Sequence, residues 1–199
     1  MKLLAYEVDK RSFLGVLNED ETWVYPVSAA GMEYRSMKDL IREAGPSEME
    51  MLDYISKKAP GDVVGAAPVD EIRVVSPIAE PDQDIICLGI NYMDHAEESA
   101  RFEKREFERP EKAIYFSKRV NRTNDPDGII PAHKNLTSQL DYEAELAVII
   151  KKDAKDVKPG EVKDYIFDYT IMNDVSAREV QTEHKQWYFG KSLEYFDSE

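Results

Sequence analysis

The sequence predicts an α+β protein in which short strands alternate with short helices. Runs rich in β-branched and aromatic residues recur along the chain and are bounded by Asn, Asp, Gly and Pro, which is typical of strands joined by turns. Between these runs lie segments with helical spacing of apolar residues and with capping signals at their starts. With 199 residues, the chain is long enough for one large domain, or for one domain with a small lobe.

Residues 1–78 are predicted to form a small N-terminal α+β lobe. Strands are expected at residues 2–8, 13–17 and 22–27, with a turn at residues 18–20 between the last two. The lobe does not gather carboxylates, histidines or glycines in a pattern that suggests chemistry. We therefore interpret it as a packing or dimerisation lobe.

Two helices are expected to follow these strands within the lobe. Ser36 is positioned to cap a first helix, which ends at Gly45. Ser47, with Glu50 three residues later, matches the capping box of a second helix, which ends before Pro60.

Residues 79–199 are predicted to form the second and larger region. A proline-bearing connector at residues 76–81 is interpreted as the hinge between the two regions. A strand at residues 72–75 is expected just before this connector. After it, in chain order, we expect a strand at residues 85–90, a helix near 94–102, strands at 113–117 and 142–150, a helix after Pro159, and a strand at 166–173.

The charge balance excludes several classes of partner. The chain has 26 Lys and Arg against 40 Asp and Glu, a formal net charge of −14, which repels phosphate backbones and anionic lipids. No run approaches the roughly 20 consecutive apolar residues of a membrane span, and Glu7 interrupts the N-terminus before a signal peptide could form. We predict a cytoplasmic protein that binds neither nucleic acid nor membrane.

Two glutamates stand out on the strand at residues 142–150. The strand period of two places Glu143 and Glu145 on one face with Ala147 and Ile149, so that face is acidic at its start and apolar beyond. Neighbouring carboxylates repel each other unless a proton or a cation lies between them. A hard divalent ion such as Mg²⁺, Mn²⁺ or Ca²⁺ would resolve this conflict. A solvated strand edge is the alternative.

A third carboxylate, Asp174, lies where the strand at residues 166–173 ends. Ser176 and Glu179 then match a capping box that opens a helix. On that helix Arg178 and Gln181 are three residues apart and share one face. A cation and an amide beside an acidic metal ligand would suit an anionic, oxygen-rich substrate. An ordinary arginine on a surface helix is the alternative.

His95 and Glu98 form a candidate pair for proton transfer. They are three residues apart, so on the helix expected near residues 94–102 they face the same way. The imidazole would take a proton from water, while the carboxylate would orient it and stabilise the imidazolium.

Four ordered motifs carry a resemblance to a known family. They are Ile86-Cys87-Leu88-Gly89-Ile90-Asn91-Tyr92 with His95 and Glu98, then Asp141-Tyr142-Glu143-Ala144-Glu145-Leu146, then Asn173-Asp174-Val175-Ser176-Ala177-Arg178, then Gln186-Trp187 with Gly190-Lys191-Ser192. In this order they resemble the fumarylacetoacetate hydrolase family. The resemblance is strong over about residues 70–199 and weak in the N-terminal lobe.

The resemblance implies a mixed β-roll catalytic domain, usually dimeric, that holds Mg²⁺ or Mn²⁺, with Ca²⁺ as a further alternative. The metal ligands it implies are Glu143, Glu145 and Asp174. The catalytic residues it implies are His95, Glu98 and Lys191, with the first two brought in by a lid that closes. The substrate-contacting residues it implies are Arg178, Gln181 and Tyr92.

The activity implied first is hydrolysis of a C–C bond in a keto acid of the acylpyruvate type, such as fumarylpyruvate or acetylpyruvate. The metal would stabilise the enolate that leaves. The resemblance implies that this reaction belongs to keto-acid catabolism and the degradation of aromatic compounds. His95 would deprotonate the attacking water, and Lys191 would neutralise developing oxyanion charge. Decarboxylases, isomerases and sugar-acid dehydratases use the same scaffold and remain alternatives. A further alternative is a truncated chain that binds metal without turnover.

Three features of the sequence depart from the common family pattern. Glu179 stands where Asp usually follows Ser-Ala-Arg, and Leu193-Glu194-Tyr195 replaces a more usual Phe-Asp-Thr, which leaves the identity of the keto acid open. Family members also continue well past Ser192 with strands that complete the roll. We therefore expect a roll that is incomplete at its C-terminus. Its open edge should cause association or impaired activity.

Overall fold

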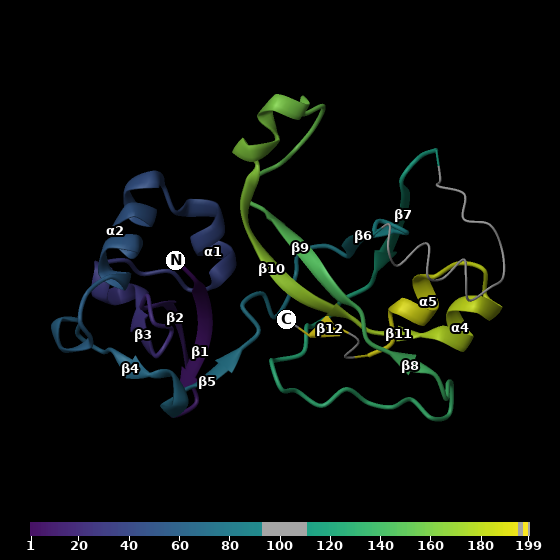
Figure 1. Ribbon diagram of the computed structural model, residues 1–199, viewed down its shortest axis with the longest axis horizontal. Coiled ribbons are helices and arrows are strands. Elements are labelled where there is room, and N and C mark those ends of the chain that lie inside the picture. Colours follow the sequence, from purple (N-terminus) through teal and green to yellow (C-terminus); the bar gives the residue numbers. More distant parts are fainter. Residues whose placement is uncertain (93–110, 195–196, 199) are drawn as a thin grey trace.

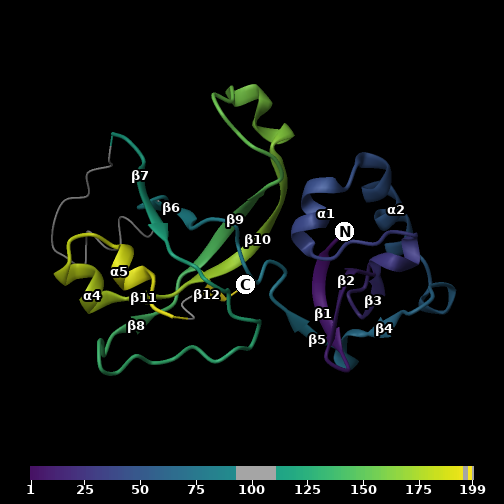
Figure 2. The same ribbon diagram turned by 180° about the vertical axis from the view of Figure 1, so that it is seen from behind.

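A computed structural model of the chain describes residues 1–92, 111–194 and 197–198 (Figure 1). The N-terminal lobe and the later strands and helices lie side by side (Figures 1 and 2). The expected α+β class is confirmed, because antiparallel sheets and short helices alternate along the chain. None of the helices in these described ranges combines the length and the apolar character needed to cross a bilayer.

The N-terminal lobe is built on a five-stranded antiparallel sheet with the order β4-β3-β2-β1-β5. Its strands are β1 (Leu3–Val8), β2 (Arg11–Leu17), β3 (Trp23–Pro26), β4 (Ala67–Pro68) and β5 (Arg73–Val75). The predicted turn between β2 and β3 is confirmed, since Asn18 Oδ1 accepts hydrogen bonds from the backbone N–H groups of Thr22 and Trp23, both at 2.9 Å.

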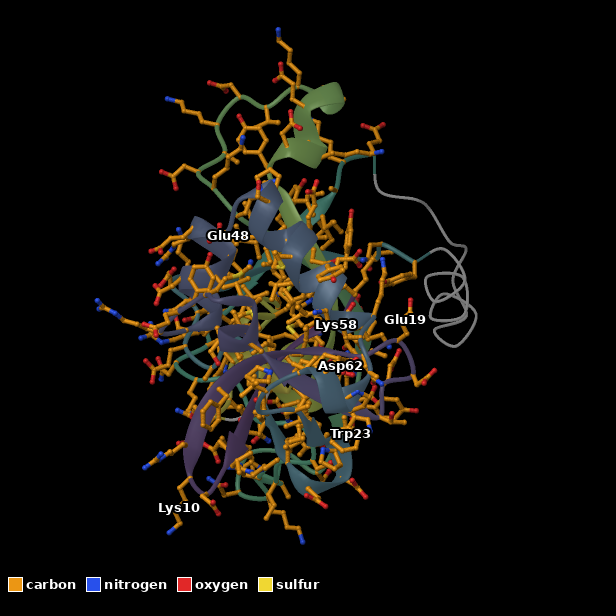
Figure 3. The ribbon with its side chains drawn as sticks, turned by 90° about the vertical axis from the view of Figure 1, so that its left-hand side faces the viewer. Lys10, Glu19, Trp23, Glu48, Lys58 and Asp62 are labelled. Carbon is orange, nitrogen blue, oxygen red and sulfur yellow. The ribbon has the colours of Figure 1, made fainter. Side chains whose placement is uncertain are left out.

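Two helices and three short 3₁₀ helices complete the lobe. They are α1 (Met37–Glu43), α2 (Pro46–Ser56), and 3₁₀ helices at Val27–Ala30, Pro60–Asp62 and Val69–Glu71. Leu40 of α1 and Leu52 of α2 are fully buried in one core with Val16 and Tyr25 of the sheet. Tyr25 also donates its hydroxyl hydrogen bond to the carbonyl of Lys58 at 2.8 Å. In the side view of Figure 3, Lys58 and Asp62 lie above Trp23 on the same side of the lobe.

The start of α1 is predicted correctly and the start of α2 is not. Ser36 Oγ accepts a hydrogen bond from Asp39 N at 3.2 Å, as an N-cap does. The expected capping box at Ser47 is wrong, because the N-cap of α2 is Gly45, two residues earlier, and Glu48 Oε2 accepts from Gly45 N at 2.7 Å. Proline suits the first helical position, since its fixed φ matches the helix and its missing N–H needs no partner there.

Glu48→Gln is expected to flatten the acid dependence of stability. The hydrogen bond from Gly45, followed by that from the Tyr34 hydroxyl, lowers the pKa of Glu48 from its ordinary value of 4.5. A carboxylate whose folded pKa is lowered stabilises the protein above its ordinary pKa and loses that contribution as the pH falls through the folded pKa. Urea unfolding from about pH 5 to pH 3 measures the slope. Glu50→Gln is the control, and equal slopes in the two variants would contradict the prediction.

Gly15→Ala is expected to destabilise the lobe by about 1 to 3 kcal/mol, the usual cost of overpacking a filled core. A Cβ at this position would clash with Val24 Cγ2 and would lie 2.9 Å from Tyr6 Cε1. Both side chains are buried, so a shift of either disturbs the packed core. Urea unfolding measures the change, and Gly160→Ala is the matched control because its Cβ would meet nothing within 4 Å. Equal losses in the two variants would count against this packing argument.

The second region is built around the antiparallel pair β9 (Ala144–Ile150) and β10 (Ile166–Asp174). In Figure 1 this curved pair rises to the 3₁₀ helix Pro159–Asp164 at its top. The remaining elements are β6 (Ile85–Gly89) paired with β7 (Ile114–Lys118), β8 (Leu140–Asp141) paired with β11 (Ser176–Ala177), β12 (Asp197–Ser198) beside β10, and the helices α4 (Arg178–Glu183) and α5 (Tyr188–Lys191).

Every strand pairing among the described residues is antiparallel. The mixed β-roll and its incompleteness at the C-terminus therefore stay predictions. The expected strands at residues 85–90, 113–117, 142–150 and 166–173 all occur within a few residues of their predicted bounds. The helix expected near residues 94–102 lies outside the described residues.

The connector at residues 76–81 is bonded on both of its sides. Ser76 Oγ and Thr123 Oγ1 are 2.5 Å apart and buried, and Thr123 N donates to the carbonyl of Ala79 at 2.9 Å. On the other side, Lys38 Nζ of α1 donates to the carbonyl of Glu80 at 2.7 Å. These bonds tie the segment to both regions, and its role as a hinge stays a prediction. The boundary at residues 78 and 79 stays a prediction.

Candidate metal and substrate site

The β9–β10 pair brings the three predicted metal-binding carboxylates to one end of the sheet. Asp174 is the last residue of β10 and is 2% exposed, and Glu143 directly precedes β9. The backbone N–H of Asp174 donates to the carbonyl of Glu143 at 2.8 Å, and Glu143 N donates to Asn173 Oδ1 at 3.1 Å. The antiparallel register places Glu145 opposite Met172, two residues before Asp174.

Two buried lysines neutralise this acidic end. Lys191 Nζ donates to Glu143 Oε2 at 2.7 Å and to Asp174 Oδ2 at 2.8 Å. Lys118 Nζ lies on the other carboxylate oxygen, 2.7 Å from Asp174 Oδ1. Burying a charge is costly unless it is paired and hydrogen-bonded, and here both lysines and Asp174 are paired.

Glu145 lies close enough to the other carboxylates to respond to their charge. Burial raises the pKa of Glu145, and the negative charges of Glu143 and Asp174 raise it further, while a hydrogen bond from Tyr92 opposes them. Like charges held together in a half-buried site favour a proton or a cation between them. The role of Glu143 and Glu145 as metal ligands stays a prediction.

The donor chemistry of this end suits a divalent cation. In the part of the chain that the structure describes, no group of three or more His, Cys, Asp or Glu stands ready to hold a metal ion. However, Glu143 Oε2 and Asp174 Oδ2 both point at one position, which the ammonium of Lys191 fills. Carboxylate oxygens that converge on a cation are the ligands that Mg²⁺ and Mn²⁺ prefer. The residues therefore fit a divalent ion, provided that the lysine side chain moves aside.

Arg178 links the carboxylates to the helix that follows. Its Nη1 atom is 2.6 Å from Glu143 Oε1 and donates to Gln181 Oε1 at 3.1 Å, so the expected shared face of Arg178 and Gln181 exists. Its Nε and Nη2 atoms donate to Asp141 Oδ2 at 2.9 and 2.7 Å. Burial alone would lower the pKa of Arg178, but the two acidic partners raise it. The guanidinium is therefore fixed and charged.

The capping box predicted at Ser176 is wrong. Ser176 belongs to β11, and its hydroxyl donates to Glu143 Oε1 at 2.8 Å. Glu179 accepts instead from Ser138 N at 2.7 Å and from Thr137 Oγ1 at 2.9 Å, and these bonds lower its pKa. Ser176 and Glu179 have the spacing of a capping box, but each side chain forms hydrogen bonds with residues distant in sequence.

Two aromatic side chains wall the site beside Lys191. Phe116 and Trp187 meet edge to face with ring centroids 5.2 Å apart, and Lys191 Nζ lies 5.2 Å from the Phe116 ring centroid. Trp187 packs directly on Gly89, where any Cβ would clash with the indole. This packing explains why glycine stands at that point of the first motif.

The predicted proton-transfer pair is not placed by the structure. His95 and Glu98 lie outside the described residues, so their role stays a prediction. Tyr92 is the last described residue before them and is 44% exposed. Its hydroxyl accepts a hydrogen bond from Leu146 N at 3.4 Å and also bonds to Glu145. The expected substrate contact of Tyr92 therefore lies at the edge of the carboxylate group.

Sequence reasoning missed two charged residues of the site. Lys118 ends β7 and is fully buried, and Asp141 receives both Nε and Nη2 of Arg178. Lys118 could have been found from its place at the end of an apolar strand. A charge buried there is costly unless it is paired, so this position predicts an acidic partner. Asp141 was visible only as part of the motif around Glu143.

Comparison with known proteins identifies similar sequences and structures. Residues 84–198 match the family model described as fumarylacetoacetate (FAA) hydrolase C-terminal. The oxaloacetate tautomerase YisK of Bacillus subtilis is 34% identical over 204 residues, which cover 98% of this chain and 66% of that protein.

Solved structures agree with this match. The fumarylacetoacetate hydrolase of Exiguobacterium antarcticum superposes with a TM-score of 0.73 at 30% identity, over 99% of this chain and 64% of that one. The 5-carboxymethyl-2-hydroxymuconate delta-isomerase of Mycobacterium smegmatis shares the fold, with a TM-score of 0.65 at 23% identity over 100% of this chain and 64% of that one. The chain thus spans about two thirds of the length of these relatives. It belongs to the fumarylacetoacetate hydrolase family.

Proposed function

We propose that this chain binds a divalent ion, Mg²⁺ or Mn²⁺, through Glu143, Glu145 and Asp174 and converts a small 2-oxo acid through its enolate. The observation that carries the proposal is the convergence of Glu143 and Asp174 on one position that already holds a cationic group, with Glu145 near enough to respond to their charges. A bound divalent ion would act there as a Lewis acid on the oxygens of the substrate.

The charge balance of the site supports an anionic substrate. Four carboxylates, those of Asp141, Glu143, Glu145 and Asp174, face the three cations Lys118, Lys191 and Arg178. The group therefore carries one net negative charge when all are ionised, and one net positive charge once a divalent ion is added. A positive, partly buried site attracts a carboxylate.

The fixed polar side chains supply orientation and charge stabilisation. Lys191 would neutralise the negative charge that develops on the substrate oxygen. Arg178 has a planar guanidinium suited to a carboxylate, and Gln181 lies beside it at 3.1 Å to contribute an amide. Tyr92 would close the side next to Glu145. These roles need no residue outside the described ranges.

The first candidate reaction is hydrolysis of a C–C bond in an acylpyruvate-type acid. This reaction needs a base for the attacking water, and His95 oriented by Glu98 is the candidate. The enolate formed when the bond breaks would be stabilised as described above. Decarboxylation and dehydration also pass through such an anion and are outcomes that product analysis distinguishes.

The second candidate is keto–enol tautomerisation, favoured by the 34% identity to the tautomerase of B. subtilis. Here the enolate is protonated on carbon without bond cleavage, so the mass of the substrate is unchanged. Isomerisation of a related unsaturated keto acid would also protonate an enolate on carbon without cleaving a bond of the carbon skeleton.

The deciding experiment is a substrate screen with the 199-residue chain, using oxaloacetate and acetylpyruvate with Mg²⁺ or Mn²⁺. Loss of the enol absorbance with two carboxylic acids in the NMR spectrum supports hydrolysis. Loss of enol without a change in mass supports tautomerisation. Metal binding without any turnover supports the third alternative, a non-catalytic metal-binding chain. Absence of metal binding at pH 7 contradicts the whole proposal.

We also propose a homodimer. Large apolar side chains on β9 and β10 are about half exposed or more, namely Leu146, Val148, Ile150, Tyr169 and Ile171. Contiguous apolar surface of this kind marks association sites. Sedimentation velocity should give about twice the mass of the chain, and a monomer at micromolar concentration would count against it.

A further inference from the structure

Lys118 is a buried charged side chain to which the proposed function gives no role beyond its contribution to the charge balance. It ends β7 with 0% of its surface exposed, and its ammonium group donates to Asp174 Oδ1 at 2.7 Å and to the carbonyl oxygen of Val175 at 2.8 Å. A buried ammonium is stable only when such partners surround it. Asp174 is the last residue of β10 and Val175 follows it, so Lys118 links β7 to the point where the site begins.

The two oxygens of Asp174 are divided between two lysines that differ in their second partner. Lys118 holds Oδ1 and the main-chain carbonyl of Val175, which is not one of the proposed metal ligands. Lys191 holds Oδ2 and Glu143 Oε2, both of which belong to the proposed metal ligands. When a metal ion enters, Lys191 must therefore yield, whereas Lys118 can stay.

We infer that Lys118 is a positioning residue for the metal site, which holds Asp174 by Oδ1 so that Oδ2 faces the position shared with Glu143. The inference rests on the proposed function only in that these carboxylates bind the ion. Partners that orient a metal ligand from outside contribute strongly to affinity, and losing one typically costs 10-fold to 100-fold.

A second effect of Lys118 acts in the same direction. With both lysines present, the charge of Asp174 is shared between two ammonium groups. Without Lys118, Lys191 becomes the remaining lysine on Asp174 and holds Oδ2 more firmly against an incoming ion. Loss of Lys118 removes some repulsion toward the metal, but it leaves the ligand both misoriented and more tightly occupied.

The test compares Mn²⁺ binding to the full chain and to three variants by calorimetric titration. Lys118→Met removes the ammonium and with it the hydrogen bonds to Asp174 and Val175, and Lys118→Gln keeps a donor without charge. Arg119→Met is the matched control, since Arg119 is exposed and the change in net charge is equal. We expect a 10-fold to 100-fold loss of affinity for Lys118→Met, a smaller loss for Lys118→Gln and none for the control.

Folding is checked by circular dichroism in the absence of metal, at a temperature where each variant remains native. If Lys118→Met does not fold, the comparison rests on Lys118→Gln, which should lose at least a few-fold in affinity. A folded Lys118 variant that binds Mn²⁺ as tightly as the unmodified chain, or more tightly, overturns the inference. If the unmodified chain itself binds no Mn²⁺, the proposed metal site fails instead, so the two failures are distinguishable.

Discussion

The chain carrying Glu143→Gln and Glu145→Gln is expected to show no measurable Mn²⁺ or Mg²⁺ binding at pH 7. An amide oxygen carries no charge, so the double change removes two of the three anionic donors proposed for the ion. It also leaves Lys191 and Arg178 facing an uncharged side chain in place of Glu143, which adds like-charge repulsion toward any cation. Calorimetric titration of the purified variant measures the loss.

The control for this variant has the same change in net charge, but at two glutamates that are not proposed as metal ligands. Glu111 and Glu183 are exposed, and Glu111→Gln with Glu183→Gln alters the total charge equally. We expect this control to bind Mn²⁺ within about 2-fold of the unmodified chain, because the charges of exposed side chains are strongly screened by water and salt. If the site variant retains affinity within the same range, these glutamates are not the ligands.

Elements set by local signals could be predicted from the sequence. The strands of the N-terminal sheet follow period-two patterns, and the cap by Ser36 depends on residues three positions away. On β9, the exposures alternate as predicted, with Glu145, Ala147 and Ile149 partly buried and the intervening residues exposed. Such patterns predict structure because each is satisfied within one strand or one helical turn.

Features that depend on distant partners could not be predicted in this way. The pairing of Lys118 with Asp174 joins residues 56 positions apart. Glu179 and Ser176 have the spacing of a capping box, but tertiary hydrogen bonds from Ser138 and to Glu143 outcompete the local ones. A local motif predicts which hydrogen bonds are possible. Which of them form depends on the tertiary structure, here on the pairing of β8 with β11.

Lys191→Met is expected to separate metal binding from turnover. In the metal-free protein Lys191 occupies the oxygens of Glu143 and Asp174 that an ion would need, so its removal should leave Mn²⁺ affinity equal or tighter. Loss of the cation facing the developing oxyanion should lower turnover of the 2-oxo acid by roughly 100-fold to 1,000-fold at saturating Mn²⁺.

Stability provides an independent check on Lys191→Met. Lys191 and Asp174 each have only 3% of their side chains exposed, so removing one partner leaves a buried charge less compensated, which costs about 3 to 5 kcal/mol where no relaxation occurs. Because a divalent ion would replace that missing charge, Mn²⁺ should raise the melting temperature of this variant more than that of the unmodified chain. Lys163→Met, at an exposed position, should leave both the affinity and the metal-induced shift unchanged. If Lys191→Met instead weakens Mn²⁺ binding by 10-fold or more, Lys191 supports the bound ion, and its competition with the ion for these oxygens is refuted.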